Sequence, residues 1–256
     1  MESQHDTPTI EPISNVPASE ATKKTVLTLP AAVLTGFALI ALAIILVVPG
    51  ANKATPSEIP AAQQAPETPT SVDKEVVTLR ANDLVKGDAA TAEILLFTYS
   101  DSDCPFCARF HPTVQSVLTN YKGKVAWVYR QFPLDMHPNA YTEAVAMECV
   151  AKLGGNTKAF TYLDSIINTT LTPDPKSNET LITIAKNEGI DGAAFKSCFS
   201  NESIAQKVDK DIADAGTIGA RGTPFSIAVN KKTGEQVVIP GAYPLEAMNE
   251  MIDSIL

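Results

Sequence analysis

An uncharged apolar stretch near the N-terminus divides this chain into parts that cannot share one fold. No charged residue lies between Lys24 and Lys53, and the stretch from Val26 to Val48 consists mostly of Leu, Ile, Val, Ala and Phe. As a helix this stretch would be about 35 Å long, enough to cross a hydrocarbon core of roughly 30 Å. We therefore predict one transmembrane helix at 26–48.

A cleaved signal peptide is the alternative interpretation of this stretch. It is disfavoured because the apolar run exceeds the roughly 7–15 residues usual for a signal peptide, and because Pro-Gly-Ala at 49–51 is a poor cleavage site. Lys23 and Lys24 precede the stretch, whereas Lys53 alone follows it closely. The positive-inside rule then predicts a single-pass cell-membrane protein with a cytoplasmic N-terminus and an extracytoplasmic C-terminal domain.

The segments that flank the apolar stretch have the composition of unfolded chain. Residues 1–25 are rich in Pro, Ser, Thr and Glu without an apolar period, which indicates a disordered cytoplasmic tail. Residues 49–71 contain five prolines, which favour an extended linker. The folded domain is therefore expected at 72–256.

Composition excludes several classes of function. The chain has 20 Lys and Arg residues against 29 Asp and Glu residues, a formal net charge of −9, and it contains no basic run, so we expect no nucleic-acid partner. Its 45% hydrophobic content is typical of a globular domain and excludes a collagenous or fully disordered chain. Four cysteines are too few for a small disulfide-stapled scaffold.

Hydrophobic periodicity predicts an α/β domain interrupted by helices. Strands are expected at 75–79, 94–99, 125–129, 225–229 and 236–239, with a hairpin turn at 231–234 between the last two. Helices are expected after Cys104, at 245–256, and through most of about 138–216, with breaks at 154–155, 172–175 and Gly189. A βαβ half and a ββα half thus enclose a helical block.

Two cysteines stand where the first of these helices is expected to begin. Pro105 suits the first helical position, which makes Cys104 the N-cap residue. The unpaired amides and the helix dipole favour a thiolate at that position, so Cys104 is the expected attacking thiol. Cys107 lies one turn later on the apolar stripe with Phe110, and we expect it to resolve a mixed disulfide.

The sequence FTYSDSDCPFCARFHP at 97–112 resembles the active-site strand and helix of DsbA-like thiol–disulfide oxidoreductases. Three further stretches, at 130–138, 222–225 and 239–242, are similar to other family segments and follow in the family's order. The resemblance covers about residues 75–256. It implies a thioredoxin-like α/β fold with an inserted helical domain at about 138–216.

The resemblance also implies which residues surround the cysteines. Pro105 and Phe106 lie between them, and Thr223 and Pro224 match the cis-proline loop that faces the active site and holds substrate peptide as an added strand. Many strongly oxidising members of the family carry histidine where this chain has Phe106. A cation beside the thiolate is then missing, which predicts a weaker oxidant.

The other residues of metal-ligating type are expected to be structural. Cys149 and Cys198 lie on apolar helical stripes, which predicts buried side chains. They are either free thiols or, in an oxidising compartment and if close enough, a structural disulfide, as some DsbA-like proteins have in the insertion. Neither has the neighbouring Cys-x-x-Cys or His pair that zinc needs, so no metal and no cofactor is expected. His137 precedes a proline at an element boundary and is expected to be structural.

The resemblance implies an enzyme that uses Cys104 and Cys107 to introduce disulfides into exported proteins with reduced cysteines. A membrane redox partner, linked to quinone, would then reoxidise it. Two alternatives stay open. One is a membrane-tethered reductase or isomerase with the same cysteines, and the other is a non-catalytic, chaperone-like module that binds extended peptides near Pro224.

Overall fold

The computed structural model describes residues 71–170 and 176–256, and these belong to one compact unit. The tail predicted at 1–25, the transmembrane helix predicted at 26–48 and nearly all of the linker at 49–71 lie outside these ranges, as does the break predicted at 172–175. Within the described ranges, no helix is both long and apolar enough to cross a membrane.

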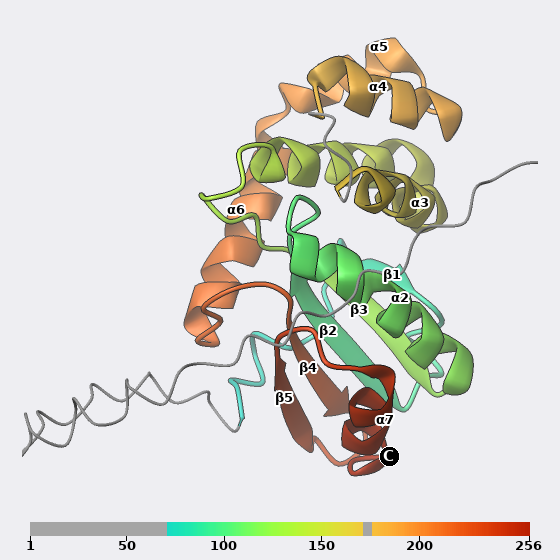
Figure 1. Ribbon diagram of the computed structural model, residues 1–256, viewed down its shortest axis with the longest axis vertical. Coiled ribbons are helices and arrows are strands. Elements are labelled where there is room, and N and C mark those ends of the chain that lie inside the picture. Colours follow the sequence, from blue (N-terminus) through green and yellow to red (C-terminus); the bar gives the residue numbers. More distant parts are fainter. Residues whose placement is uncertain (1–70, 171–175) are drawn as a thin grey trace, which may run out of the picture. The chain divides into compact units, whose positions relative to one another are not determined.

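Five strands of the described residues form one mixed sheet, in the order β1-β3-β2-β4-β5 (Figure 1). They are β1 (Leu84–Lys86), β2 (Ile94–Ser100), β3 (Val125–Gln131), β4 (Phe225–Asn230) and β5 (Gln236–Pro240). Strands β2 and β3 pair in parallel, whereas β1 with β3, β2 with β4 and β4 with β5 are antiparallel. Every residue of β2 and β3 is buried, which is why both strands are nearly continuous apolar runs in the sequence.

Helices cover the sheet and form the predicted insertion. The helices are α2 (Pro105–Asn120), α3 (Ala140–Thr170), α4 (Asn178–Asn187), α5 (Gly192–Phe199), α6 (Glu202–Thr217) and α7 (Leu245–Asp253). Figure 1 shows α3, α4 and α5 grouped beyond one end of the sheet, with α6 leading back to β4. The break predicted at 154–155 is a kink within α3, where Gly155 has φ 80°.

The alternation of side chains along the strands separates two core layers. One face of the sheet contributes Leu96 and Trp127, which pack with α2, α3 and α7. The other face contributes Phe97 and Val128, which pack with the end of α6 and with Val77. In α2 and α6 the inward face follows the 3-and-4 spacing of apolar residues, whereas α3 is buried at every position from Glu143 to Val150.

The strand predicted at 75–79 is wrong. This segment is a turn, because the side chain of Asp73 accepts a hydrogen bond from Glu75 N at 2.9 Å and its carbonyl accepts one from Val76 N at 3.2 Å. An aspartate that bonds to the backbone two residues later competes with strand pairing. The first strand begins instead at Leu84.

A disulfide joins Cys149 on α3 to Cys198 on α5, across 49 residues of chain. Both residues are buried in the core of the helical block. Of the two states that the sequence leaves open, the structure therefore has the bridge.

Replacing both Cys149 and Cys198 with Ala is expected to lower the free energy of unfolding by about 2–4 kcal/mol, because the unfolded chain regains the freedom of a long closed loop. Urea unfolding of the full chain, followed by circular dichroism, measures the change. The Cys104–Cys107 chemistry should be unaffected in the same variant at low urea. A loss of stability well under about 1 kcal/mol would contradict this account.

Candidate active site

Cys104 and Cys107 lie at the start of α2, at the end of the sheet where β2 ends. Cys104 is the N-cap residue in extended conformation and Pro105 is the first helical residue, as the sequence predicts. Both cysteines are free thiols, and the Cys107 thiol lies deeper in the protein than that of Cys104. The pair therefore has one outer and one inner sulfur atom.

Thr223 and Pro224 approach this pair from the loop before β4. The Thr223–Pro224 peptide bond is cis, and Cys104 Sγ lies 3.7 Å from the Thr223 carbonyl oxygen, to which it donates when it is protonated. The Thr223 hydroxyl is also buried beside Cys104 and helps to stabilise its thiolate. Residues more than a hundred positions apart in the sequence thus meet at one sulfur atom.

The surroundings of the two sulfur atoms separate their pKa values. A hydrogen bond from the Cys107 thiol lowers the pKa of Cys104 to about 5 against the effect of burial, with help from Thr223 and from the backbone N–H groups of Phe106 and Cys107. Burial raises the pKa of Cys107 well above its ordinary value, and the neighbouring Cys104 raises it further. At neutral pH the reduced pair is one thiolate and one thiol.

The residues just before Cys104 are held by polar side chains from other elements. Ser102 donates to Glu143 at 2.6 Å, and Lys176 lies 2.8 Å from the other oxygen of that carboxylate and 3.5 Å from Asp103. Both Glu143 and Lys176 are buried. Burial raises the pKa of Glu143, which Lys176 partly offsets. This cluster joins the loop that carries Cys104 to α3.

Asp101 and His137 form a second pair beside the cysteines. The Asp101 carboxylate is buried and lies 2.6 Å from His137 Nδ1, and it accepts a hydrogen bond from Leu134 N at 2.9 Å. His137 belongs to the loop between β3 and α3. His137 thus holds Asp101, whose carbonyl accepts a hydrogen bond from Cys104 N at 3.2 Å. The signal available in the sequence was its place in the stretch 130–138.

Phe106, between the cysteines, points outward. Its ring is 59% exposed, and the Arg109 guanidinium lies 4.6 Å from the ring centroid. The exposed ring gives the rim of the site an apolar surface next to Cys104.

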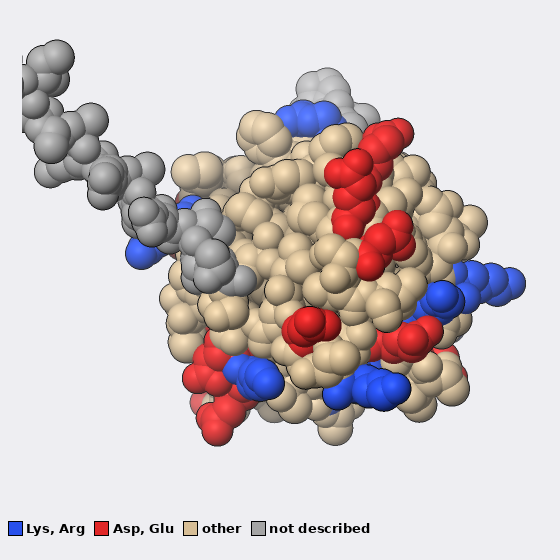
Figure 2. Space-filling view, turned by 90° about the horizontal axis from the view of Figure 1, so that it is seen from below, with Lys and Arg blue, Asp and Glu red and all other residues tan. Residues whose placement is uncertain are grey.

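Figure 2 shows one face of the protein, on which Lys and Arg lie in small separate groups among Asp and Glu.

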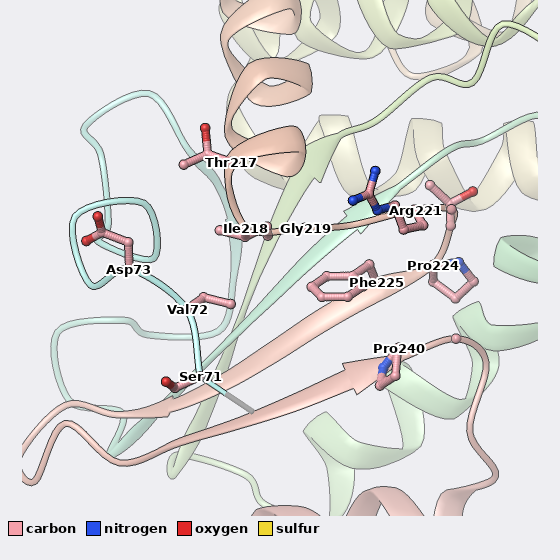
Figure 3. Close-up of a pocket in the computed structure, with 13 residues that line it drawn as sticks. Ser71, Val72, Asp73, Thr217, Ile218, Gly219, Arg221, Pro224, Phe225 and Pro240 are labelled. Carbon is pink, nitrogen blue, oxygen red and sulfur yellow. The ribbon is translucent and has the colours of Figure 1, made fainter. Parts of the chain in front are cut away.

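A pocket of about 560 Å³ adjoins the loop that carries Thr223 (Figure 3). It is bounded by the end of α6, by the ends of β4 and β5, and by the segment at 71–73. Its lining includes Val72, Ile218, Arg221, Thr223, Phe225 and Pro240. The lining mixes apolar side chains with polar ones, and it carries one exposed cation, Arg221, and one exposed anion, Asp73. A side chain of a bound peptide could enter here while its backbone lies along the loop.

Comparison with solved structures places this architecture among DsbA proteins. A variant of alpha-DsbA1 from Wolbachia pipientis superposes with a TM-score of 0.63 at 22% identity, covering 72% of this chain and 96% of that chain. DsbA2 from Pseudomonas aeruginosa superposes with a TM-score of 0.56 at 26% identity, covering 70% and 97%. The expected DsbA-like thioredoxin fold with a helical insertion is confirmed.

Curated sequence relatives include membrane transporters. The Na(+)/H(+) antiporter NhaA 3 of Salinispora tropica is 27% identical over 164 residues, which are 64% of this chain and 23% of the antiporter. The chain thus spans about a quarter of the length of the curated relatives that it matches. A family model described as thioredoxin matches residues 80–253, from the segment before β1 to the end of α7. The chain therefore belongs to the thioredoxin family.

Proposed function

We propose that this protein is an extracytoplasmic thiol–disulfide oxidoreductase that donates the Cys104–Cys107 disulfide to exported proteins. The observation that carries the proposal is the place of Cys104 at the N-cap of α2, outside buried Cys107 and against Thr223, which lowers the pKa of Cys104 to about 5. A stable Cys104 thiolate stabilises the reduced protein, and a protein whose reduced form is stabilised is an oxidant in its disulfide form. Direction of electron flow follows from this one group.

The transfer proceeds in two exchanges. A substrate thiolate attacks Cys104 Sγ in the disulfide, which breaks the bond to Cys107 and forms a mixed disulfide; Cys107 leaves and takes up a proton. A second substrate thiolate then attacks the substrate sulfur of the mixed disulfide and releases Cys104 as a thiolate. Two electrons pass from the substrate to the protein. The substrate gains one disulfide, and of its two thiol protons one stays on Cys107 and one goes to solvent.

The substrate is an unfolded or extended segment with a reduced cysteine. The loop at Thr223 and Pro224 lies against Cys104, and its backbone offers hydrogen-bonding groups to an added strand. The pocket next to it would take a neighbouring substrate side chain. Exposed Phe106 would cover the other side of the substrate.

The predicted helix at 26–48 would tether the domain to the outer face of the cell membrane, within reach of a quinone-linked redox partner. The likeness to part of several antiporters supports a membrane setting, because those relatives are themselves named as membrane transporters. Reoxidation moves two electrons and the one proton of Cys107 from the reduced pair to that partner, and solvent supplies the second proton that a quinone takes up.

The equilibrium with glutathione tests the direction of transfer. The full chain, equilibrated in glutathione redox buffers at pH 7, should hold its Cys104–Cys107 pair reduced at ratios at which the glutathione couple itself is largely oxidised. The redox state of this pair is read by alkylation and mass spectrometry, which separates it from the Cys149–Cys198 bridge.

The pH dependence of the stability of the reduced form follows from the direction in which the Cys104 pKa is shifted. The depressed pKa of Cys104 stabilises the reduced form fully above about pH 9, its ordinary value, and the stabilisation is lost as the pH falls through about 5. The disulfide should therefore become a weaker oxidant relative to a simple dithiol as the pH is lowered from 9 to 5. A potential at or below that of glutathione at pH 7 would instead make the protein a reductase.

A further inference from the structure

Asp101 is a buried anion three residues before the reactive Cys104. Its carboxylate accepts hydrogen bonds from the backbone N–H groups of Asp103 at 2.8 Å and Leu134 at 2.9 Å, and it lies 2.6 Å from His137 Nδ1. The Asp101 side chain is inaccessible to solvent. An anion at this place would raise the energy of a thiolate nearby unless a cation balances it.

His137 is placed to be that cation. Its backbone N–H donates to the Leu134 carbonyl at 2.9 Å, which closes the loop around Asp101, and only 18% of its side chain is exposed. Partial burial lowers the pKa of His137, but the hydrogen bond and charge of Asp101, then the charges of Cys104 and Asp103, raise it overall. The backbone N–H of Cys104 donates to the Asp101 carbonyl at 3.2 Å, so the Asp101–His137 pair is joined to the residue that carries the reactive sulfur.

The other charged groups near this pair are already engaged. Asp103 accepts a hydrogen bond from Asn139 N at 3.1 Å and lies 3.5 Å from Lys176, which is bonded to Glu143. Arg109 stacks on the exposed ring of Phe106. Among these side chains, the imidazole of His137 is the one bonded to Asp101 and electrostatically coupled to Cys104.

We propose that His137 is a positioning residue that stabilises the Cys104 thiolate from the loop between β3 and α3, by neutralising the buried Asp101 carboxylate that precedes Cys104. The proposal rests on the function proposed above. It supplies, from a different element, the charge that Phe106 does not provide between the cysteines. The absence of a cation between the cysteines, which by itself would make the disulfide a weaker oxidant, is then partly offset by a residue from another part of the sequence.

Replacing His137 with Gln removes the charge and keeps a hydrogen-bond donor for Asp101. In the reduced full chain, the thiolate absorbance of Cys104 should titrate at higher pH, and the equilibrium constant for oxidation of glutathione at pH 7 should fall by about threefold to tenfold. H137K should restore most of both values, since it returns a cation. The difference between H137Q and the unaltered chain should vanish at alkaline pH, where His137 is neutral.

The pKa of His137 itself provides a second, independent test, because the stabilisation between the imidazolium and the thiolate is mutual. If the imidazolium stabilises the thiolate, then the thiolate must stabilise the imidazolium to the same extent. The pKa of His137, measured by NMR, should therefore be higher in the reduced chain than in the disulfide form. No purely structural role of His137 predicts this difference.

His111→Gln is the matched control. His111 lies on α2 and is also bonded to a carboxylate, Asp164, and its ring packs near Trp127. H111Q should leave the titration of Cys104 unchanged. Equal Cys104 titration curves for H137Q and the unaltered chain would overturn the role of His137. Failure of the unaltered chain to oxidise a dithiol peptide would instead overturn the proposed function, whatever the titration curves show.

Discussion

Replacing Cys104 with Ser is expected to lower the rate of disulfide transfer to a reduced peptide by about 10³-fold or more, because no disulfide can form at this position. The introduced hydroxyl would not ionise at neutral pH, so neither exchange step is available. Oxidation of a dithiol peptide by the preoxidised full chain, followed by fluorescence or mass spectrometry, measures the rate. Retained oxidation in this variant would refute the assignment of Cys104 as the nucleophile.

Replacing Cys107 with Ser is the matched control, because it alters the partner sulfur and leaves the nucleophile in place. The thiolate of Cys104 can then attack a disulfide peptide, but no second thiol resolves the product, so a mixed disulfide should accumulate. Combining the two substitutions tests the chaperone-like alternative. If the double variant still binds peptides near Pro224 and the unaltered chain shows no exchange, then the site is a binding module.

The sequence predicts the two reactive cysteines better than the residues that alter the pKa of Cys104. Cys104 and Cys107 are adjacent on one turn, so spacing and capping rules place them correctly. Thr223 is found only through its resemblance to a known loop, since no local rule brings it to Cys104. His137 belongs to a loop whose fold depends on Asp101, and a single aspartate in a sequence does not reveal which backbone groups it binds.

The fold shows the same division. The buried strands β2 and β3 are predicted by their apolar runs, and the helical insertion by its period. The segment at 75–79 contains two valines and a leucine that also favour a strand, but Asp73 forms a turn there. A pattern of apolar side chains predicts which residues can be buried. It does not predict where a polar side chain forms a hydrogen bond to the backbone and ends a strand.

Buried charges join the insertion to the sheet, and these were not predicted. Arg80 contacts Asp83, Asp211 and Asp214, which places α6 against the segment before β1. Lys207 on α6 lies 2.8 Å from Asp211 and 3.1 Å from Glu148 on α3. The side chain of Gln131 at the end of β3 donates to Glu148 at 3.0 Å. The result is a continuous polar layer between the helical block and the sheet.

Arg130 is the inner end of this layer and is completely buried within β3. Its guanidinium donates to Asp83 at 2.9 and 3.1 Å, to Tyr99 Oη at 2.9 Å, to the Thr78 carbonyl at 2.7 Å and to the Val76 carbonyl. Burial raises the pKa of Asp83, but the hydrogen bonds and charge of Arg130 outweigh this effect and lower the pKa overall.

Replacing Arg130 with Leu is expected to lower the free energy of unfolding by about 3–5 kcal/mol, because buried Asp83 keeps only Arg80 as a cationic partner and the carbonyl groups of Val76 and Thr78 lose their donor. Urea unfolding of the full chain measures the loss. Lys210→Ala is the matched control: Lys210 also pairs with an aspartate, Asp214, but its side chain is 60% exposed, so the loss should be about 0–1 kcal/mol.

The partner variant separates the ion pair from simple packing. If the loss of stability in Arg130→Leu comes from leaving the Asp83 carboxylate without the Arg130 guanidinium, then adding Asp83→Leu should recover part of that stability. The losses of the two single variants should then not add. The acid dependence has a defined sign: because the folded pKa of Asp83 is depressed, its contribution is present above the ordinary aspartate pKa and is lost as the pH falls through the folded value. Strictly additive losses would show that Arg130 stabilises the sheet through its contacts with Phe97 and Tyr99 rather than through its charge.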